Sequence, residues 1–156
     1  MKTLVIIPCG KRKIWSKNLE AGPTKAKDTY IGSPFKVHRE YAENLGDPWV
    51  ILSAKYGFLE PDQIIPENYN VTFKDPSTNP IPLWKLKKQV ERTYSHYTCI
   101  VTLGGRDYSK IVSNIFKDKK TPVYSPLAGL PIGKALAKVK KATRAGTPFK
   151  CKEIKG

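Results

Sequence analysis

Residues 49–57 read WVILSAKYG and decide the fold class that the sequence predicts. The first four residues are apolar and rich in β-formers, which is typical of a strand buried on both faces and so of a parallel sheet. Ligands of open parallel sheets bind beyond the carboxyl ends of the strands, so Ser53, Lys55 and Tyr56 lie where chemistry is expected. The alternative is a plain strand-to-turn junction, in which Gly57 supplies a positive φ and Lys55 is solvated.

Strands and helices alternate along the rest of the chain. The other expected strands are residues 3–7, 99–103 and 122–125. The expected helices are residues 33–45, 82–94, 109–116 and 134–143. Residues 14–33 predict an irregular lid or binding loop, and the proline-rich residues 60–82 predict an extended ordered loop over the sheet edge. This order predicts an α/β fold: a three-layer sandwich around a mostly parallel sheet of about four strands.

The length of 156 residues and the 40% hydrophobic content fit a single α/β domain, residues 1–145, with a basic C-terminal tail, residues 146–156. The first apolar run is too short for a signal peptide or a membrane span, so we expect a cytoplasmic protein without a membrane partner. Cys9, Cys99 and Cys151 are an odd and widely spaced set, which predicts neither a disulfide framework nor a zinc site. Only His38 and His96 could add ligands, so no metal is expected.

The formal net charge of +15 indicates a polyanionic partner, and nucleic acid, either DNA or tRNA, is the obvious one. Basic residues are concentrated in the last forty residues, where eleven Lys and Arg face only Asp118 and Glu153. This asymmetry favours a nucleic-acid surface over a charge that serves only solubility. The expected helix over residues 134–143 carries much of this charge, and its alternative interpretation is an amphipathic helix with a solvated lysine side.

Three strand ends carry similar polar clusters and converge if the sheet is parallel. Each cluster combines a small residue, a cation and a hydroxyl or thiol, which predicts one phosphate- or base-binding cleft. The expected binding residues are Gly10, Lys11, Lys13, Ser53, Gly57, Gly104, Gly105, Arg106 and Tyr108. The expected catalytic residues are Cys9, Lys55 and Tyr56.

Cys9 is the most chemically suggestive of these residues. The neighbouring cations Lys11, Arg12 and Lys13 are expected to lower the pKa of its thiol and so favour a nucleophilic thiolate. The alternative is a small buried strand-end residue, which is how most free cysteines behave. The Lys55-Tyr56 pair has a comparable claim as an acid/base or phosphate-binding pair. No Walker loop, dinucleotide fingerprint, HExxH or GxSxG motif occurs, and no cofactor is expected.

Several motifs together resemble an uncharacterised family of short bacterial and phage proteins, over nearly the whole chain. They are the CGxxK motif of residues 9–13, Tyr30-Ile31-Gly32-Ser33-Pro34-Phe35, the LSAKYGxLxP motif of residues 52–61, Tyr69, residues 104–108 and Pro126-Leu127. The first and third motifs are more distantly similar to the YaaA-type peroxide-stress proteins that bind DNA. They are also similar to the domain of archaeosine synthase that joins lysine to a 7-cyano-7-deazaguanine base in tRNA. That resemblance places Cys9, Lys11 and Lys13 in related positions, whereas YaaA-type proteins lack the cysteine.

These resemblances imply a nucleic-acid-directed enzyme that acts on a modified base or nucleotide, as a base-modifying transferase or an N-glycosidic hydrolase. A target base must leave its stack to enter such a cleft, and Trp15, Tyr30, Tyr56 and Tyr108 are candidates to stack on it. Two alternatives stay open: a DNA-binding module without activity, and an enzyme for small nucleotides. The oligomeric state is not predicted.

Overall fold

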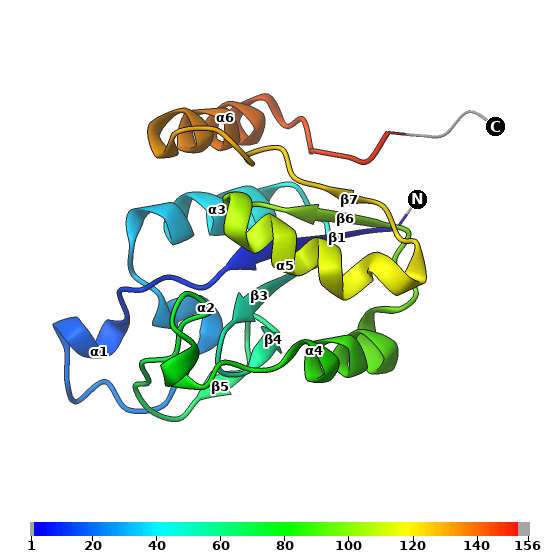
Figure 1. Cartoon of the computed structure of the whole chain (residues 1–156). Helices are drawn as coiled ribbons and strands as arrows, with labels where there is room; N and C mark the ends of the chain where they lie inside the picture. Colours follow the sequence, from blue (N-terminus) through cyan, green and yellow to red (C-terminus); the bar gives the residue numbers. More distant parts are fainter. Residues whose placement is uncertain (1, 153–156) are drawn as a thin grey trace.

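The computed structural model describes residues 2–152 and contains a five-stranded sheet in the order β4-β3-β1-β6-β7 (Figure 1). The strands are β1 Thr3–Pro8, β3 Trp49–Ser53, β4 Gly57–Leu59, β6 Cys99–Thr102 and β7 Val123–Tyr124. Parallel pairing joins β3, β1, β6 and β7, whereas β4 runs antiparallel to β3. The predicted α/β class and the mostly parallel sheet are confirmed.

Within this sheet, the strand that the sequence did not predict is β4, which gives the sheet five strands instead of about four. The chain reverses direction after Ser53, and Gly57 completes the turn with a φ of +75°, a conformation that glycine adopts without strain. The Gln89 side chain fixes the hairpin, because its amide nitrogen donates to the Tyr56 carbonyl (3.0 Å) and its oxygen accepts from the Phe58 amide (2.9 Å).

The register of the parallel strands brings three strand ends to one edge. Pro8 at the end of β1 lies opposite Leu52 of β3, and Ile6 lies opposite Thr102 of β6. The ladder continues one residue further on both sides of β1. The Cys9 amide donates to the Leu52 carbonyl (3.1 Å), and the amide that follows β6 donates to the Ile6 carbonyl (3.0 Å).

Helices lie against both faces of the sheet (Figure 1). The helices α3 Ser33–Asn44 and α6 Ile132–Ala145 pack on one face. The other face carries α4 Leu83–Gln89, its π-helical continuation Val90–Tyr94, and α5 Arg106–Phe116. Alternate residues of β1 serve the two faces: Val5 and Ile7 join the first cluster, and Leu4 and Ile6 join the second. All four are at most 1% exposed, which explains why residues 4–7 of the strand are all apolar.

The predicted irregular character of residues 14–33 is wrong. This segment contains α1 Ile14–Lys17, β2 Thr24–Lys25 and α2 Ala26–Thr29. Trp15 anchors it, because its buried indole donates a hydrogen bond to the Gly22 carbonyl (3.0 Å). The segment also pairs with the proline-rich loop, since β2 forms a small antiparallel sheet with β5 Ile64–Ile65. Two short 3-10 helices, Pro76–Thr78 and Lys117–Lys119, complete the elements of residues 2–152.

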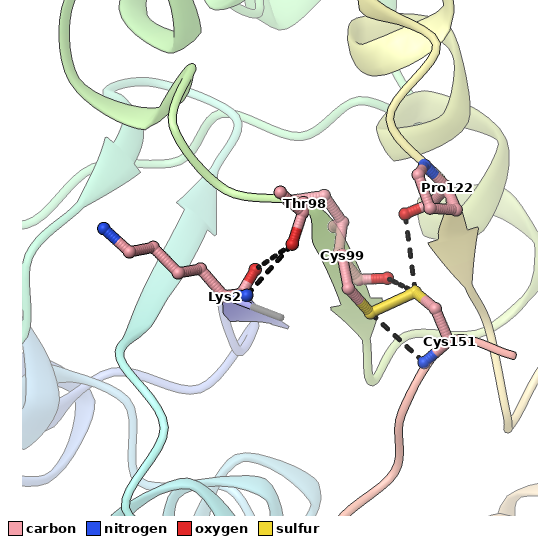
Figure 2. The surroundings of a disulfide bond; sticks show 6 residues. Lys2, Thr98, Cys99, Pro122 and Cys151 are labelled. Carbon is pink, nitrogen blue, oxygen red and sulfur yellow. Dashed lines mark hydrogen bonds between the residues drawn. A yellow bond between two sulfur atoms is a disulfide. The ribbon is translucent and has the colours of Figure 1, made fainter. Parts of the chain in front are cut away.

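A disulfide joins Cys99 at the start of β6 to Cys151, 52 residues later (Figure 2). The sequence predicted no disulfide, because a separation of this length gives no local sign of pairing. The Cys151 amide also donates to the Cys99 sulfur (3.2 Å). The bond therefore attaches the segment after α6 to the end of the sheet where the strands begin.

Part of the segment expected as a tail packs on the domain. The Phe149 ring stacks on Tyr41 of α3 at 5.2 Å between centroids, and the Phe149 amide donates to the Tyr41 hydroxyl (2.7 Å). Cys151 is 7% exposed. The remainder of the expected tail, residues 153–156, lies outside the described residues. Between residues 2 and 152, the structure has no helix of the length and apolar character needed to cross a bilayer.

The disulfide predicts a redox-dependent stability. Replacing Cys151 with Ser should lower the free energy of unfolding by about 2–4 kcal/mol, because the unfolded chain loses a large closed loop. Urea unfolding with and without dithiothreitol measures this. The wild type and Cys9→Ser should both lose stability on reduction, whereas Cys151→Ser should not respond. Equal stability of the reduced and oxidised wild type would contradict the assignment.

Candidate functional site

A cavity of about 440 Å³ opens at the carboxyl edge of the sheet, and we call it the lysine cavity. Its lining combines three lysines, a thiol, two phenol rings and small polar side chains, and no acidic side chain of the described chain is part of it. The lining residues are Cys9, Gly10, Lys11, Lys13, Ala54, Tyr69, Asn70, Val71, Thr72, Lys74 and Tyr108. A cavity of this size and sign suits an anionic ligand of nucleotide dimensions.

Four parts of the chain form this cavity. The loop after β1 supplies the thiol and two lysines, and the turn after β3 supplies Ala54. The proline-rich loop supplies residues 69–74, and the first turn of α5 supplies Tyr108. Gly104 is needed for this last placement, because a Cβ atom there would lie 2.6 Å from the Tyr108 Cβ.

Tyr69 holds the proline-rich loop over the sheet edge. Its hydroxyl forms hydrogen bonds with Ser53 Oγ (3.0 Å) and with the Tyr30 hydroxyl, both inside the protein. Burial raises the pKa of Tyr69 to about 12, so the hydroxyl stays protonated near neutral pH. Ser53 Oγ also accepts hydrogen bonds from the amides of Lys55 and Tyr56 (both 3.2 Å). Ser53 is fully buried and acts here as a positioning residue for Tyr69.

Two lysines of this region, Lys13 and Lys55, lie against the Tyr69 ring and have no carboxylate partner among the described residues. Lys13 Nζ lies 4.4 Å from the centre of the Tyr69 ring, and Lys55 Nζ lies 5.7 Å from it. Such cation–π contacts orient an ammonium group without neutralising it. Burial lowers the pKa of Lys13. A bound anion would reverse that effect, because an opposite charge favours the charged amine.

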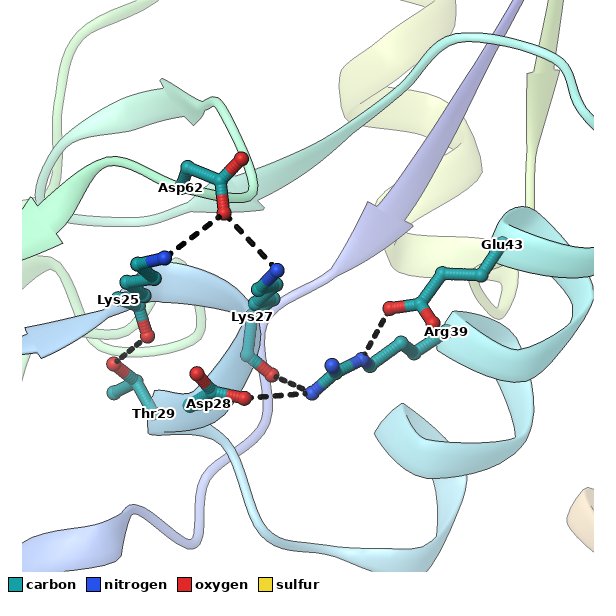
Figure 3. A network of polar contacts seen from close by, with 7 residues as sticks. All are labelled: Lys25, Lys27, Asp28, Thr29, Arg39, Glu43 and Asp62. Atoms are coloured by element: carbon teal, nitrogen blue, oxygen red, sulfur yellow. Dashed lines mark hydrogen bonds and ion pairs between the residues drawn. The ribbon is translucent and has the colours of Figure 1, made fainter.

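Several acidic side chains instead form ion pairs in a network outside the lysine cavity (Figure 3). Asp62 pairs with Lys27 (3.0 Å), and Arg39 of α3 pairs with Asp28 of α2 (3.0 Å) and with Glu43. This network connects α2 with α3 and with the start of the proline-rich loop. Within residues 2–152, the ion pairs do not include any lysine of the lysine cavity.

Cys9 lies in the wall of the cavity, with its sulfur 3.3 Å from the Tyr108 hydroxyl oxygen. Burial raises the pKa of the thiol, and this effect outweighs the hydrogen bond from Tyr108 and the nearby charge of Lys13, which lower it. The expected lowering of the thiol pKa by the flanking cations is therefore wrong. The side chains of Lys11 and Arg12 are exposed, so water screens their charges. Without a ligand, Cys9 is a neutral thiol.

The structure brings only part of the predicted site together. Of the predicted residues, the lysine cavity contains Cys9, Gly10, Lys11, Lys13 and Tyr108. Lys55 and Tyr56 are not part of its lining and lie against the Tyr69 ring. Gly57 belongs to the β3–β4 hairpin, and Arg106 lies exposed near Gly129. Gly104 and Gly105 line a separate small cavity on the α6 side of the sheet.

Two of the aromatic residues expected to stack on a base are core residues instead. Trp15 is 5% exposed and Tyr30 is 2% exposed, so neither presents a ring face to a ligand. Tyr108 does line the cavity, and Tyr69 adds a ring that was not predicted as part of the site. Tyr69 occurred in the motif set, but its position over the strand ends depends on the path of the proline-rich loop.

The residue that sequence reasoning missed most clearly is His38. It is 4% exposed, and its Nδ1 atom has no hydrogen-bond partner within the described part of the chain. Burial lowers the pKa of His38 to about 4, so its imidazole is neutral at physiological pH. The sequence did contain a signal for its burial. His38 lies three residues after Phe35 and three before Tyr41, which places it on the buried side of α3. Across residues 2–152, no cluster of three or more potential metal ligands is present.

The raised thiol pKa predicts slow alkylation of Cys9. The rate of reaction with iodoacetamide should rise mainly above pH 9, because the reactive thiolate is scarce below the thiol pKa. Mass spectrometry of the oxidised protein, in which Cys9 is the one free cysteine, measures the rate. Replacing Tyr108 with Phe removes a hydrogen bond that favours the thiolate and should slow the reaction further. Rapid alkylation at pH 6 would contradict this.

His38 predicts a loss of stability in mild acid. Its pKa is 6.5 in the unfolded chain and about 4 in the folded one, so its protonation favours unfolding as the pH falls from 6.5 to 4. The shift corresponds to about 3 kcal/mol at the acidic end of this range. Urea unfolding between pH 7.5 and pH 4 measures the effect. The pH dependence should shrink in His38→Gln and persist in His96→Gln, a matched exposed control. The same slope in both variants would refute it.

Comparisons with known proteins give one family match and one similar bacterial protein. Residues 4–141 match the model described as "Family of unknown function (DUF6884)". The chain is also 40% identical over 116 residues to the "Uncharacterized protein YfjM" of Bacillus subtilis (strain 168). That alignment covers 74% of this chain and 77% of the relative. No solved structure gives a significant match.

Proposed function

The chain belongs to the DUF6884 family, and we propose that it is an enzyme acting on a base or nucleotide of a nucleic acid. The lysine cavity is the observation that carries this proposal. It lies beyond the carboxyl ends of parallel strands, where open α/β sheets bind ligands, and its cations have no acidic partners among the described residues. Phosphate is the anion that several converging ammonium groups suit best.

The geometry supports a division of roles. Lys11, Lys13 and Lys74 bind the phosphate of the target nucleotide, and Tyr69 keeps Lys13 in place. Cys9 and Tyr108 lie in the same wall and reach the sugar or base of that nucleotide. Lys55 extends the cationic surface outward, toward the next phosphate along a strand. The distant similarities to YaaA-type proteins and to archaeosine synthase point to the same class of substrate.

A chemical role of Cys9 requires the thiol to lose its proton to a group that the ligand brings or orders. In the free protein the thiol is neutral, so a nucleophilic step begins only after binding. This protects Cys9 from unwanted reactions while the cavity is empty. Replacing Cys9 therefore tests the chemical step separately from the binding of the ligand.

A second candidate is a nucleic-acid-binding module without activity, and α6 is the observation that favours it. Lys134, Lys138, Lys140, Lys141 and Arg144 are all exposed on this helix. A shallow hollow of about 490 Å³ on α6 includes three of these cations. This surface would bind phosphates without reading bases.

Binding and chemistry can be tested together. Wild-type protein should bind single-stranded DNA or tRNA more weakly as salt increases, and Lys13→Gln should weaken binding about threefold or more and reduce the salt dependence. Lys88→Gln is the matched control, because Lys88 lies on α4 away from the cavity. Nucleosides from the treated nucleic acid should change in mass with wild-type protein and not with Cys9→Ala.

Three outcomes decide between the candidates. Unchanged nucleosides, with binding that depends on the α6 lysines and not on Lys13, would favour the binding module. Binding of free mononucleotides with no affinity for nucleic acid would favour an enzyme for small nucleotides. Loss of affinity in Lys88→Gln equal to that in Lys13→Gln would remove the lysine cavity from the proposal.

A further inference from the structure

A second cavity, of about 260 Å³, lies on the other side of the loop after β1, and we call it the histidine cavity. It shares Cys9, Gly10 and Lys11 with the lysine cavity, so this short stretch of chain separates the two. Its far wall is Phe35 and His38 of α3. The two cavities therefore adjoin at Cys9, although they differ in chemistry.

The histidine cavity is apolar where the lysine cavity is cationic. Pro8, Pro34 and Phe35 contribute to its wall, and Phe35 is 2% exposed. The thiol of Cys9 and the imidazole of His38 are both neutral near pH 7, because burial raises the pKa of the thiol and lowers that of the imidazole. Lys11 and Arg12 lie at its exposed side. Such a pocket suits a flat, uncharged group attached to an anion.

The buried ring nitrogen Nδ1 of His38 indicates which kind of ligand the histidine cavity would bind. Buried polar atoms in folded proteins almost always have a hydrogen-bond partner, and leaving one unpaired is costly. His38 Nδ1 is buried without such a partner in residues 2–152. The same side chain also borders a third cavity, of about 250 Å³, that continues to Leu103 and Leu127. An imidazole between two hollows is placed to meet a ligand with polar edges.

We propose that the histidine cavity is the base-binding subsite: it takes the uncharged heterocycle of the nucleotide whose phosphate lies on the lysines, and His38 forms a hydrogen bond with that base. This inference rests on the proposed function. It assigns the base of the nucleotide to the histidine cavity and the phosphate to the lysine cavity. Cys9, at the junction of the two cavities, then lies beside the bond between base and sugar. Gly10 packs closely beside Tyr30 and Phe35, because a Cβ on Gly10 would be in van der Waals contact with the Cβ atoms of both (3.4 and 3.8 Å).

Two histidines in the chain make nuclear magnetic resonance a direct test. The four ribonucleoside 5′-monophosphates are the probes, and ribose 5-phosphate is the control that lacks a base. At least one mononucleotide should shift the ring signals of His38 and leave those of the exposed His96 unchanged. Ribose 5-phosphate should bind to the lysines without moving the His38 signals.

Affinities of two His38 variants complete the test, with thermal unfolding to verify that each variant folds. His38→Phe should weaken the binding of that mononucleotide at least tenfold and leave ribose 5-phosphate unaffected. His38→Gln, which keeps a hydrogen-bonding side chain, should recover part of the loss. Lys13→Gln should weaken both ligands equally.

The failures of the two proposals are distinguishable. If the mononucleotides bind through Lys13 while the His38 signals stay still, or if His38→Phe binds them as the wild type does, the base subsite is wrong and the proposed function stands. If no mononucleotide binds, and a single-stranded pentanucleotide also fails to bind, both proposals are overturned.

Discussion

The parallel pairing of β1 with both β3 and β6 is the constraint on which the rest of the structure depends. Because β1 lies between two neighbouring strands, with helices on both faces of the sheet, its pleat directs alternate side chains into two apolar clusters. The chain leaves β1 at the same edge as it leaves β3 and β6. Cys9 therefore meets Ala54 and Tyr108, which are distant from it in sequence, at one cavity.

The distribution of charge follows a second constraint, the small number of acidic residues. The structure places several of them in exposed ion pairs, such as Asp62 with Lys27 and Asp118 with Lys87. Exposed pairs of this kind contribute little to stability, so their main effect is on local charge. At the lysine cavity no carboxylate of the described chain is available, and Lys13 is held by an aromatic ring in a partly buried position. An arrangement that costs stability in the empty protein is typical of a binding site.

Sequence reasoning predicted the parts of the fold that depend on local pattern. The strands over residues 3–7, 49–52 and 99–103 follow from continuous apolar runs, and all three are present. It could not predict β4, because the reversal at Gly57 is held by the hydrogen bonds that Gln89, a distant residue of α4, forms with Tyr56 and Phe58. The disulfide was not predicted either, because it also depends on a contact between distant residues: 52 positions separate the two cysteines. The pKa of Cys9 was misjudged because sequence shows neighbouring charges but not burial. Tyr69 reaches the site because of the path of the proline-rich loop, and His38 because of the orientation of α3 about its axis. Neither position at the site can be read from local sequence.

The position of the disulfide also indicates where a label or linker can be attached without blocking the cavities. Next to the disulfide, the Lys2 amide donates to Thr98 Oγ1 (2.9 Å) and the Lys2 carbonyl accepts from the Thr98 amide (2.9 Å) (Figure 2). Both Lys2 and Cys151 therefore lie where the strands begin. The cavities lie where the strands end, and six residues of β1 span roughly 20 Å between the two edges. A dye, a surface linker or a fusion partner attached near either of these residues would therefore point away from the ligand. Immobilised or labelled protein is thus suited to measurements with large polyanions, which need the opposite edge of the sheet unobstructed.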